Sequence, residues 1–164
     1  MGNCEKNDCY DLLRSSTLAV ELTDSQCKIL ADVIYTRILV DGDVLIKEGS
    51  VDNSLHVIIH GQLAVMKETG VDLGETLTIL KPGELAGAMG FIDGLDHSAT
   101  LRSIGETRLF SLERDKFEQL LDTHPLIVYR VMRAITRSIH AIVRRMNTQY
   151  VEMTNYITKQ RGRY

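Results

Sequence analysis

The sequence predicts a mainly β domain with flanking helices, followed by one long C-terminal helix. Between Ile38 and Leu112, short runs rich in Val, Ile and Leu are separated by glycines, a pattern typical of an antiparallel roll or barrel. Residues 17–34 and 114–122 have helical spacing of their apolar residues, with Thr23 or Asp24 and residues 112–115 as plausible helix starts. From about Pro125 the apolar period becomes helical and remains so for about thirty residues.

The composition indicates one globular domain. A chain of 164 residues with 44% hydrophobic residues can bury a core of its own. No stretch approaches the roughly 18 apolar residues that cross a membrane, and the polar N-terminus lacks the apolar segment of a signal peptide. We therefore expect a cytoplasmic protein with an N-terminal segment (1–15), a β-roll with flanking helices (16–125) and a long helix with a basic tail (126–164).

The most informative stretch is residues 81–100, KPGELAGAMGFIDGLDHSAT. It resembles the phosphate-binding cassette of the cyclic nucleotide-binding domain family, in which a Pro-Gly turn precedes Gly-Glu-Leu-Ala, a short helix and Arg-Ser/Thr-Ala. In that family the Glu binds the ribose 2′-hydroxyl and the Arg binds the cyclic phosphate. An ungapped alignment from Pro82-Gly83 to Ser98-Ala99-Thr100 puts Ala88 at the Glu position and His97 at the Arg position.

Both replacements predict weak or lost binding of cyclic AMP. A guanidinium clamps a phosphate with two charge-assisted hydrogen bonds, whereas His97 offers at most one, and Ala88 cannot accept a hydrogen bond from a ribose. Each missing contact costs roughly 1.5–3 kcal/mol. Backbone N–H groups at the start of the short helix would remain to face a cyclic nucleotide or another small anion. The predicted ligand-binding positions are Gly87, Ala88, Met89, His97, Ser98 and Ala99.

A second register is open at this point. Residues 83–86 spell Gly-Glu-Leu-Ala by themselves, four residues earlier. This register restores the ribose Glu as Glu84, but it puts four extra residues before His97 and leaves Gly87 without a role. Neither register restores an arginine, because the odd spacing of Arg102 from His97 along a strand sends the two side chains to opposite faces.

The resemblance covers roughly residues 16–150. Residues 40–49 are similar to the opening of the family's β-roll, 55–65 to its central strand-Gly-strand unit, and 107–125 to its last strand and the following helix. The resemblance implies a double-stranded β-helix of the jelly-roll type. It also implies a long C-terminal helix that pairs with its twin in a dimer and covers the nucleotide base.

The C-terminal helix carries a heptad pattern that predicts a parallel homodimer. The alternative is that the stripe packs on its own domain, as its first turns are expected to do. The seam consists of Met132, Ile139, Met146 and Met153 interleaved with Val128, Ile135, Ile142, Gln149 and Tyr156, and it is widened by Val143, Tyr150 and Ile157.

The charges are distributed unevenly. Residues 1–123 hold 11 Lys/Arg against 21 Asp/Glu, whereas residues 124–164 hold 8 Lys/Arg against the single acid Glu152. A basic helix could contact nucleic acid or an acidic membrane, but the preferred interpretation is that it balances the acidic roll. DNA-binding members of the family carry a winged helix-turn-helix after this helix, and the sequence stops at Tyr164. Direct DNA binding is therefore not expected.

No motif predicts a metal site or catalysis. The three cysteines, Cys4, Cys9 and Cys27, lack the fourth thiolate of an iron–sulfur cluster, and we expect reduced thiols. His56 and His60 would share a strand face, but they lack Cys or carboxylate partners at ligand spacing.

The sequence also lacks a P-loop, a nucleophile elbow and a paired carboxylate motif. It therefore predicts a non-catalytic regulatory sensor module of the cyclic nucleotide-binding type. The alternative is a homodimeric interaction protein that keeps the fold without a ligand; the sequence does not identify a protein partner for either.

Overall fold

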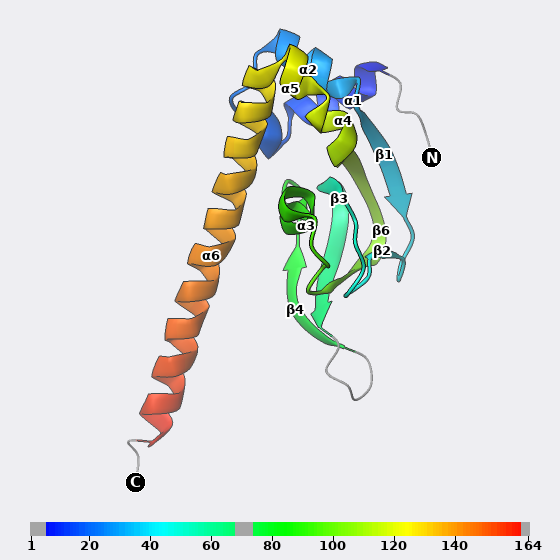
Figure 1. Cartoon of the computed structure of the whole chain (residues 1–164). Helices are drawn as coiled ribbons and strands as arrows, with labels where there is room; N and C mark the ends of the chain where they lie inside the picture. The colour runs from blue at the N-terminus through cyan, green and yellow to red at the C-terminus, as the bar shows by residue number, and fades with distance from the viewer. Residues whose placement is uncertain (1–5, 68–73, 162–164) are drawn as a thin grey trace.

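The computed structural model describes residues 6–67 and 74–161. Short helices gather at one end of a β-roll, and a long helix starts among them and extends past the roll (Figure 1). This helix is α6 (Pro125–Arg161). The short helices are α1 (Lys6–Arg14), the 3-10 turn η1 (Thr17–Ala19), α2 (Asp24–Ala31), α4 (Arg114–Glu118) and α5 (Leu120–Thr123).

The roll is built on two long antiparallel strands, β3 (Ser54–Lys67) and β6 (Thr100–Glu113), which pair along most of their length. The strand order is β1-β6-β3-β4, with β2 also pairing with β6 and β5 with β3. The shorter strands are β1 (Ile34–Leu39), β2 (Val44–Ile46), β4 (Glu75–Leu80) and β5 (Leu85–Ala86). The predicted antiparallel roll with flanking helices and a long C-terminal helix is confirmed.

The register of strand β3 against β6 shifts next to Gly61, between His60 and Gln62. Gly61 has φ of 82°, and a Cβ there would lie 2.4 Å from the carbonyl oxygen of Glu106. Only glycine tolerates both this backbone conformation and this approach. The glycine that separates the two halves of the central unit in the sequence therefore lies where the pairing of β3 with β6 is irregular.

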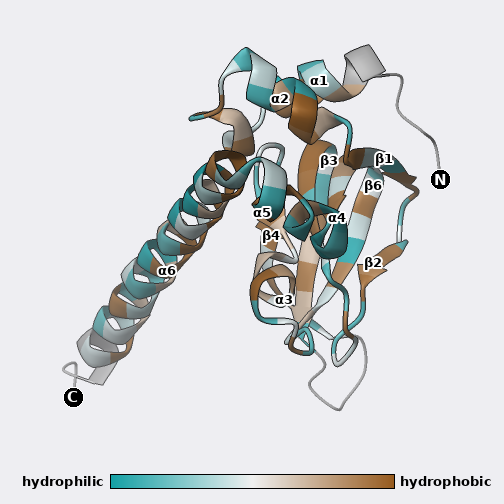
Figure 2. Ribbon diagram, turned by 45° about the horizontal axis from the view of Figure 1, so that its top comes forward, coloured by the Kyte–Doolittle hydropathy of each residue, from teal (hydrophilic) through white to brown (hydrophobic). Residues whose placement is uncertain are grey.

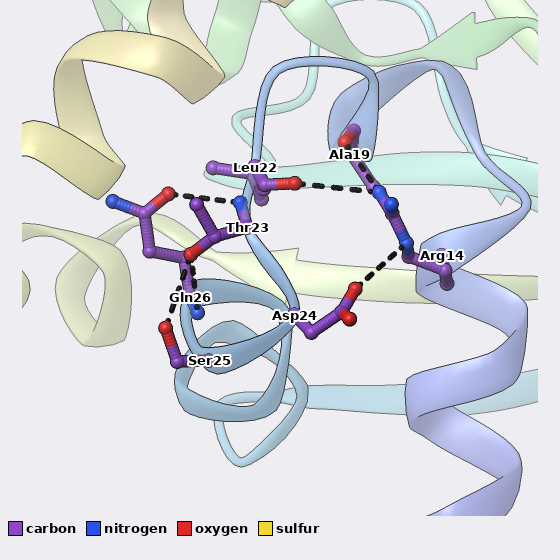
Figure 3. Close-up of polar contacts among 7 residues, drawn as sticks. All are labelled: Arg14, Ala19, Leu22, Thr23, Asp24, Ser25 and Gln26. Atoms are coloured by element: carbon purple, nitrogen blue, oxygen red, sulfur yellow. Dashed lines mark hydrogen bonds and ion pairs between the residues drawn. The ribbon is translucent and has the colours of Figure 1, made fainter.

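The start of α2 is fixed by a capping box at Thr23. The Thr23 hydroxyl accepts from the Gln26 N–H, and the Gln26 side chain accepts from the Thr23 N–H at 3.1 Å. Arg14 reaches from α1 to the carbonyls of Ala19 and Leu22 and to the Asp24 carboxylate, each at 3.3 Å (Figure 3). These contacts explain why a helix begins here.

The structure corrects three expectations about the flanking helices. Within residues 17–34, α2 begins after Thr23 as the sequence predicted, but residues 17–19 form only the short turn η1, and β1 already begins at Ile34. The helix expected over 114–122 is split into α4 and α5. The N-terminal segment contains α1, which the short polar sequence did not reveal.

The core has two parts. One lies inside the roll, and the other joins the short helices to one end of the roll and to the first turns of α6, where Ile127, Val131 and Ile135 are buried. From Val143 to Thr158 every residue of α6 is exposed. Hydrophobic residues nevertheless recur along this part of the helix (Figure 2). The first turns of the predicted seam thus pack on their own domain, as expected.

Within the described ranges, no helix is long and apolar enough to cross a membrane. Cys9 and Cys27 are buried in the helical core, and Cys4 lies outside the described residues.

Candidate functional site

The cassette turns from β5 into the short helix α3 (Ala88–Asp93) at Gly87. Gly87 caps this helix in a left-handed conformation with φ of 76°, and a Cβ there would lie 2.8 Å from the Ser54 carbonyl oxygen. Gly87 is therefore required by the turn. The helix begins at Ala88, the position at which the ungapped alignment expected the ribose Glu.

Glu84 lies outside this helix, in the turn of residues 81–84. Its Oε2 accepts from the Lys81 N–H at 2.7 Å, and its Oε1 accepts from Arg145 Nη1 of α6 at 3.1 Å. The carboxylate is thus occupied by contacts within the protein. The second register, which assigns Glu84 to a ribose, gains no support from this geometry.

His97 is held against α3 by contacts of its backbone and its ring. Its N–H donates to the Ser50 carbonyl at 2.9 Å, and its carbonyl accepts from the Gly49 N–H at 2.8 Å. The imidazole Nε2 lies 3.0 Å from the Asp52 carbonyl oxygen, so Nε2 must be the protonated nitrogen, because a carbonyl can only accept. The ring also lies over Gly90, where a Cβ would come within 2.6 Å of Cε1.

The remaining predicted positions differ in exposure. Met89 is 60% exposed and Ala88 packs partly against the helical core. Ser98 is exposed, and its carbonyl accepts from Lys67 Nζ at 2.9 Å, while Ala99 is half-buried. The contact of the His97 ring with Gly90 places His97 beside the short helix that residues 87–89 begin.

A buried polar cluster beneath the cassette was not predicted from the sequence. The fully buried His56 of β3 has its Nδ1 2.7 Å from Ser111 Oγ of β6, and its Nε2 3.8 Å from Asp52 Oδ2. The Ser111 hydroxyl can donate to Nδ1, which leaves the Nε2–H facing the carboxylate. Asp52 also accepts from the Ser54 N–H at 2.7 Å.

The environment of this cluster sets its charges. Burial lowers the pKa of His56 below its ordinary 6.5, although the Asp52 carboxylate acts in the opposite direction. Burial alone would raise the pKa of Asp52, but the facing His56 and the Ser54 N–H hold it at about 2. A neutral imidazole therefore faces an ionised carboxylate.

Neither catalysis nor metal binding follows from these histidines. Ser111, His56 and Asp52 are residue types of a hydrolytic triad, but Ser111 is fully buried and no substrate can reach its hydroxyl. His60 is exposed, because a shift in register separates it from Ile58 and the buried part of β3. In the part of the chain that the structure describes, no three His, Cys, Asp or Glu residues form a metal-binding group.

Comparison with known proteins agrees with this architecture. The sequence model of the cyclic nucleotide-binding domain family matches residues 36–124, which is more than half of the chain. The cyclic AMP receptor protein of Thermus thermophilus is 22% identical over 125 residues, covering 76% of this chain and 58% of that protein. The chain spans between 15% and 58% of the length of the first four curated relatives that it matches.

Solved structures share the fold. A cyclic nucleotide-binding domain from Methylobacillus flagellatus KT superimposes with a TM-score of 0.79 at 20% identity, over 90% of this chain and 83% of that one. The regulatory subunit of a cAMP-independent protein kinase A from Trypanosoma brucei gives a TM-score of 0.68 at 18% identity, over 81% of this chain and 46% of that one. A triple mutant of the same subunit, bound to cAMP, gives a TM-score of 0.69 at 17% identity over the same shares.

Proposed function

The chain belongs to the cyclic nucleotide-binding domain family, and we propose that it is a non-catalytic regulatory module with weak or lost affinity for cyclic AMP. One observation carries the proposal: Ala88 opens α3 without any group that could accept from a ribose, while the His97 imidazole is bonded to the Asp52 carbonyl. These observations support the proposal that the chain lacks the two contacts through which the family binds the ribose and the phosphate.

The size of the effect follows from the two missing contacts. At roughly 1.5–3 kcal/mol each, they correspond to a loss of about two to four decades in affinity. The Trypanosoma brucei subunit supports this reasoning, because it is described as cAMP-independent and yet has this fold. Its cAMP-bound mutant carries three substitutions, one of which introduces an arginine.

Titration calorimetry with cyclic AMP tests the proposal. The unaltered protein should show no binding at micromolar nucleotide, and Ala88→Glu combined with His97→Arg should raise the affinity at least about tenfold. His97→Gln is the matched control, because it removes the imidazole without supplying a guanidinium. Micromolar binding by the unaltered protein would overturn the proposal and favour the second register, in which Glu84 binds the ribose.

The second candidate is a module that keeps the fold without any ligand. It is favoured by the contacts His97–Asp52 and Glu84–Arg145, which hold the cassette through groups of the protein itself. Thermal unfolding with cyclic AMP, cyclic GMP, cyclic dinucleotides and common metabolites separates the two candidates. A ligand at about 100 times its Kd adds about 2.7 kcal/mol of stability, whereas a ligand-free module would show no shift with any of them.

For assembly, the proposal is a parallel homodimer through α6, with a seam rotated from the predicted one. Ile135 is fully buried in its own domain and belongs to the first turns of the helix, so it cannot contribute to the seam between two helices. A second heptad stripe is offset from the predicted one. It consists of Tyr129, Thr136, Val143, Tyr150 and Ile157 alternating with Met132, Ile139, Met146 and Met153. Met132 and Ile139 pack partly against the helical core, so this stripe forms an exposed apolar face from Val143 onward.

Two features support self-association through this face. Between positions 140 and 156 the residues that flank it include no Lys, Arg, Asp or Glu, which limits repulsion between like helices there: His140, Ile142, Asn147, Gln149, Thr154 and Tyr156. Near the start of the helix, Tyr129, Met132, Arg133, Thr136 and Arg137 line a groove of about 390 Å³ that continues the same face. The cytoplasmic location and the lack of direct DNA contact stay predictions from the sequence.

A further inference from the structure

Helix α6 is held to the rest of the chain in two different ways along its length. Its first turns are anchored by buried apolar residues as far as Ile135, and Ile139 packs partly against the same core. From Val143 onward the side chains are exposed. Arg145 lies in this exposed part, and its Nη1 donates to Glu84 Oε1 at 3.1 Å. Among the described residues, no hydrogen bond or ion pair joins α6 to the body farther along the helix.

The other partner of this contact is rigidly placed. Glu84 Oε2 accepts from the Lys81 N–H at 2.7 Å, and the Glu84 carbonyl accepts from the Ile58 N–H of β3 at 3.2 Å. The adjacent Gly83 donates its N–H to the Ile58 carbonyl at 2.8 Å, and its own carbonyl accepts from the Thr17 hydroxyl at 3.2 Å. The turn of residues 81–84 thus joins β3 and η1, and it leads directly into the strand and helix of the cassette.

We propose that the Glu84–Arg145 pair is a latch that couples the turn of residues 81–84 to the distal half of α6 (residues 143–158). A displacement of this turn separates the two charges, and the distal half then pivots about its last apolar anchor at Ile139. The latch goes beyond the proposed function, because it acts on the position of the helix whether or not the cassette binds a nucleotide.

The exposure of the pair suits a reversible contact. The side chains of Glu84 and Arg145 are 32% and 41% exposed, and ion pairs so accessible to water contribute little to stability and weaken with salt. Such a pair does not brace the fold, but it biases the position of a helix that has no other described side-chain anchor in this region. The distal half of α6 carries the exposed apolar face, so the latch would set how that face is presented to a partner.

Hydrogen exchange of the full chain without ligand tests the latch. Glu84→Gln and Arg145→Gln each remove the ion pair, and after the first change the new amide oxygen at position 84 can still accept from the Lys81 N–H. Each variant should exchange about two- to fivefold faster in peptides that cover residues 139–150. The double variant should exchange no faster than either single one, because both changes break the same contact.

Arg144→Gln is the matched control, because it removes the same charge from the neighbouring position of the same helix. It should exchange like the unaltered protein, and the effect of Arg145→Gln should disappear in about 1 M NaCl. Equal exchange in the Arg144 and Arg145 variants would overturn the latch, as would additive effects of the Glu84 and Arg145 changes. Nucleotide affinity does not enter these measurements, so the latch and the proposed loss of cyclic AMP binding can fail independently.

Discussion

The contact between His97 and Gly90 predicts that one substitution changes stability in opposite directions in two backgrounds. The substitution is Gly90→Ala, inside α3. A Cβ at position 90 would lie 2.6 Å from Cε1 and 2.7 Å from Nε2 of His97, and 3.2 Å from the Asp52 carbonyl oxygen. The imidazole would have to move, and it would lose its hydrogen bond to that carbonyl.

The magnitude combines three effects. Alanine is more favourable than glycine inside a helix by roughly 0.8–1 kcal/mol. Loss of the hydrogen bond from His97 costs about 0.5–1.5 kcal/mol, and overpacking costs a further 1–3 kcal/mol or so. Gly90→Ala should therefore lower the free energy of unfolding by about 1–3 kcal/mol in the natural sequence. In a His97→Ala background the two shortest of these contacts are removed and the Asp52 carbonyl at 3.2 Å remains, so the same change should be neutral or stabilise by up to about 1 kcal/mol.

Urea unfolding of the four proteins at one concentration and pH 7 measures both effects. The difference between the two backgrounds is the coupling energy between positions 90 and 97. If Gly90→Ala lowered the free energy of unfolding equally in both backgrounds, the imidazole would not lie over Gly90 as described. Equal effects would mean that additivity holds within about 0.3–0.5 kcal/mol.

Two further predictions concern pH and assembly. Burial lowers the pKa of His56 in the folded protein, so below about pH 6.5 the unfolded chain binds a proton at this residue more readily than the folded protein does. The urea concentration at the unfolding midpoint should therefore decrease as the pH is lowered from about 8 to 5. The decrease should be smaller in His56→Gln. The free energy of unfolding should decrease again as the pH falls from about 4 towards 2, because Asp52 binds a proton at a higher pH in the unfolded chain than in the folded protein. Val143→Glu with Met146→Glu, both exposed within the protomer, should convert the dimer to a monomer of 18.5 kDa by light scattering, with the far-UV signal retained. A dimer that survives this change would place the interface elsewhere.

The sequence predicted the features that depend on neighbouring residues. The capping residue Thr23, the glycines that punctuate the roll, and the start of the short helix after Gly87 are each determined by the local conformation that those residues allow. The ungapped alignment needed only the spacing of a turn and a helix, and its assignment of Ala88 and His97 to the family's binding positions stays a prediction.

The features that the sequence did not reveal depend on contacts between distant segments. His56 lies beside Ser111, 55 residues away, and His97 reaches Asp52, 45 residues away. Neither pairing leaves a local pattern. The face of α6 was ambiguous for a related reason, because apolar residues occupy more than one heptad stripe and only burial distinguishes Ile135, which belongs to the core, from Val143, which does not.

His97, at the position where we propose that the family's arginine is missing, makes contacts within the protein. His97 needs a glycine at position 90 to reach the Asp52 carbonyl, and both are present in this sequence. An arginine at position 97 would have to leave this contact in order to face a phosphate, so His97→Arg should cost about 0.5–1.5 kcal/mol of stability even where it adds affinity. The Ala88→Glu with His97→Arg variant should thus bind cyclic AMP more tightly and unfold more easily without it. The increase in stability that cyclic AMP gives this variant must therefore be measured relative to the same variant without ligand.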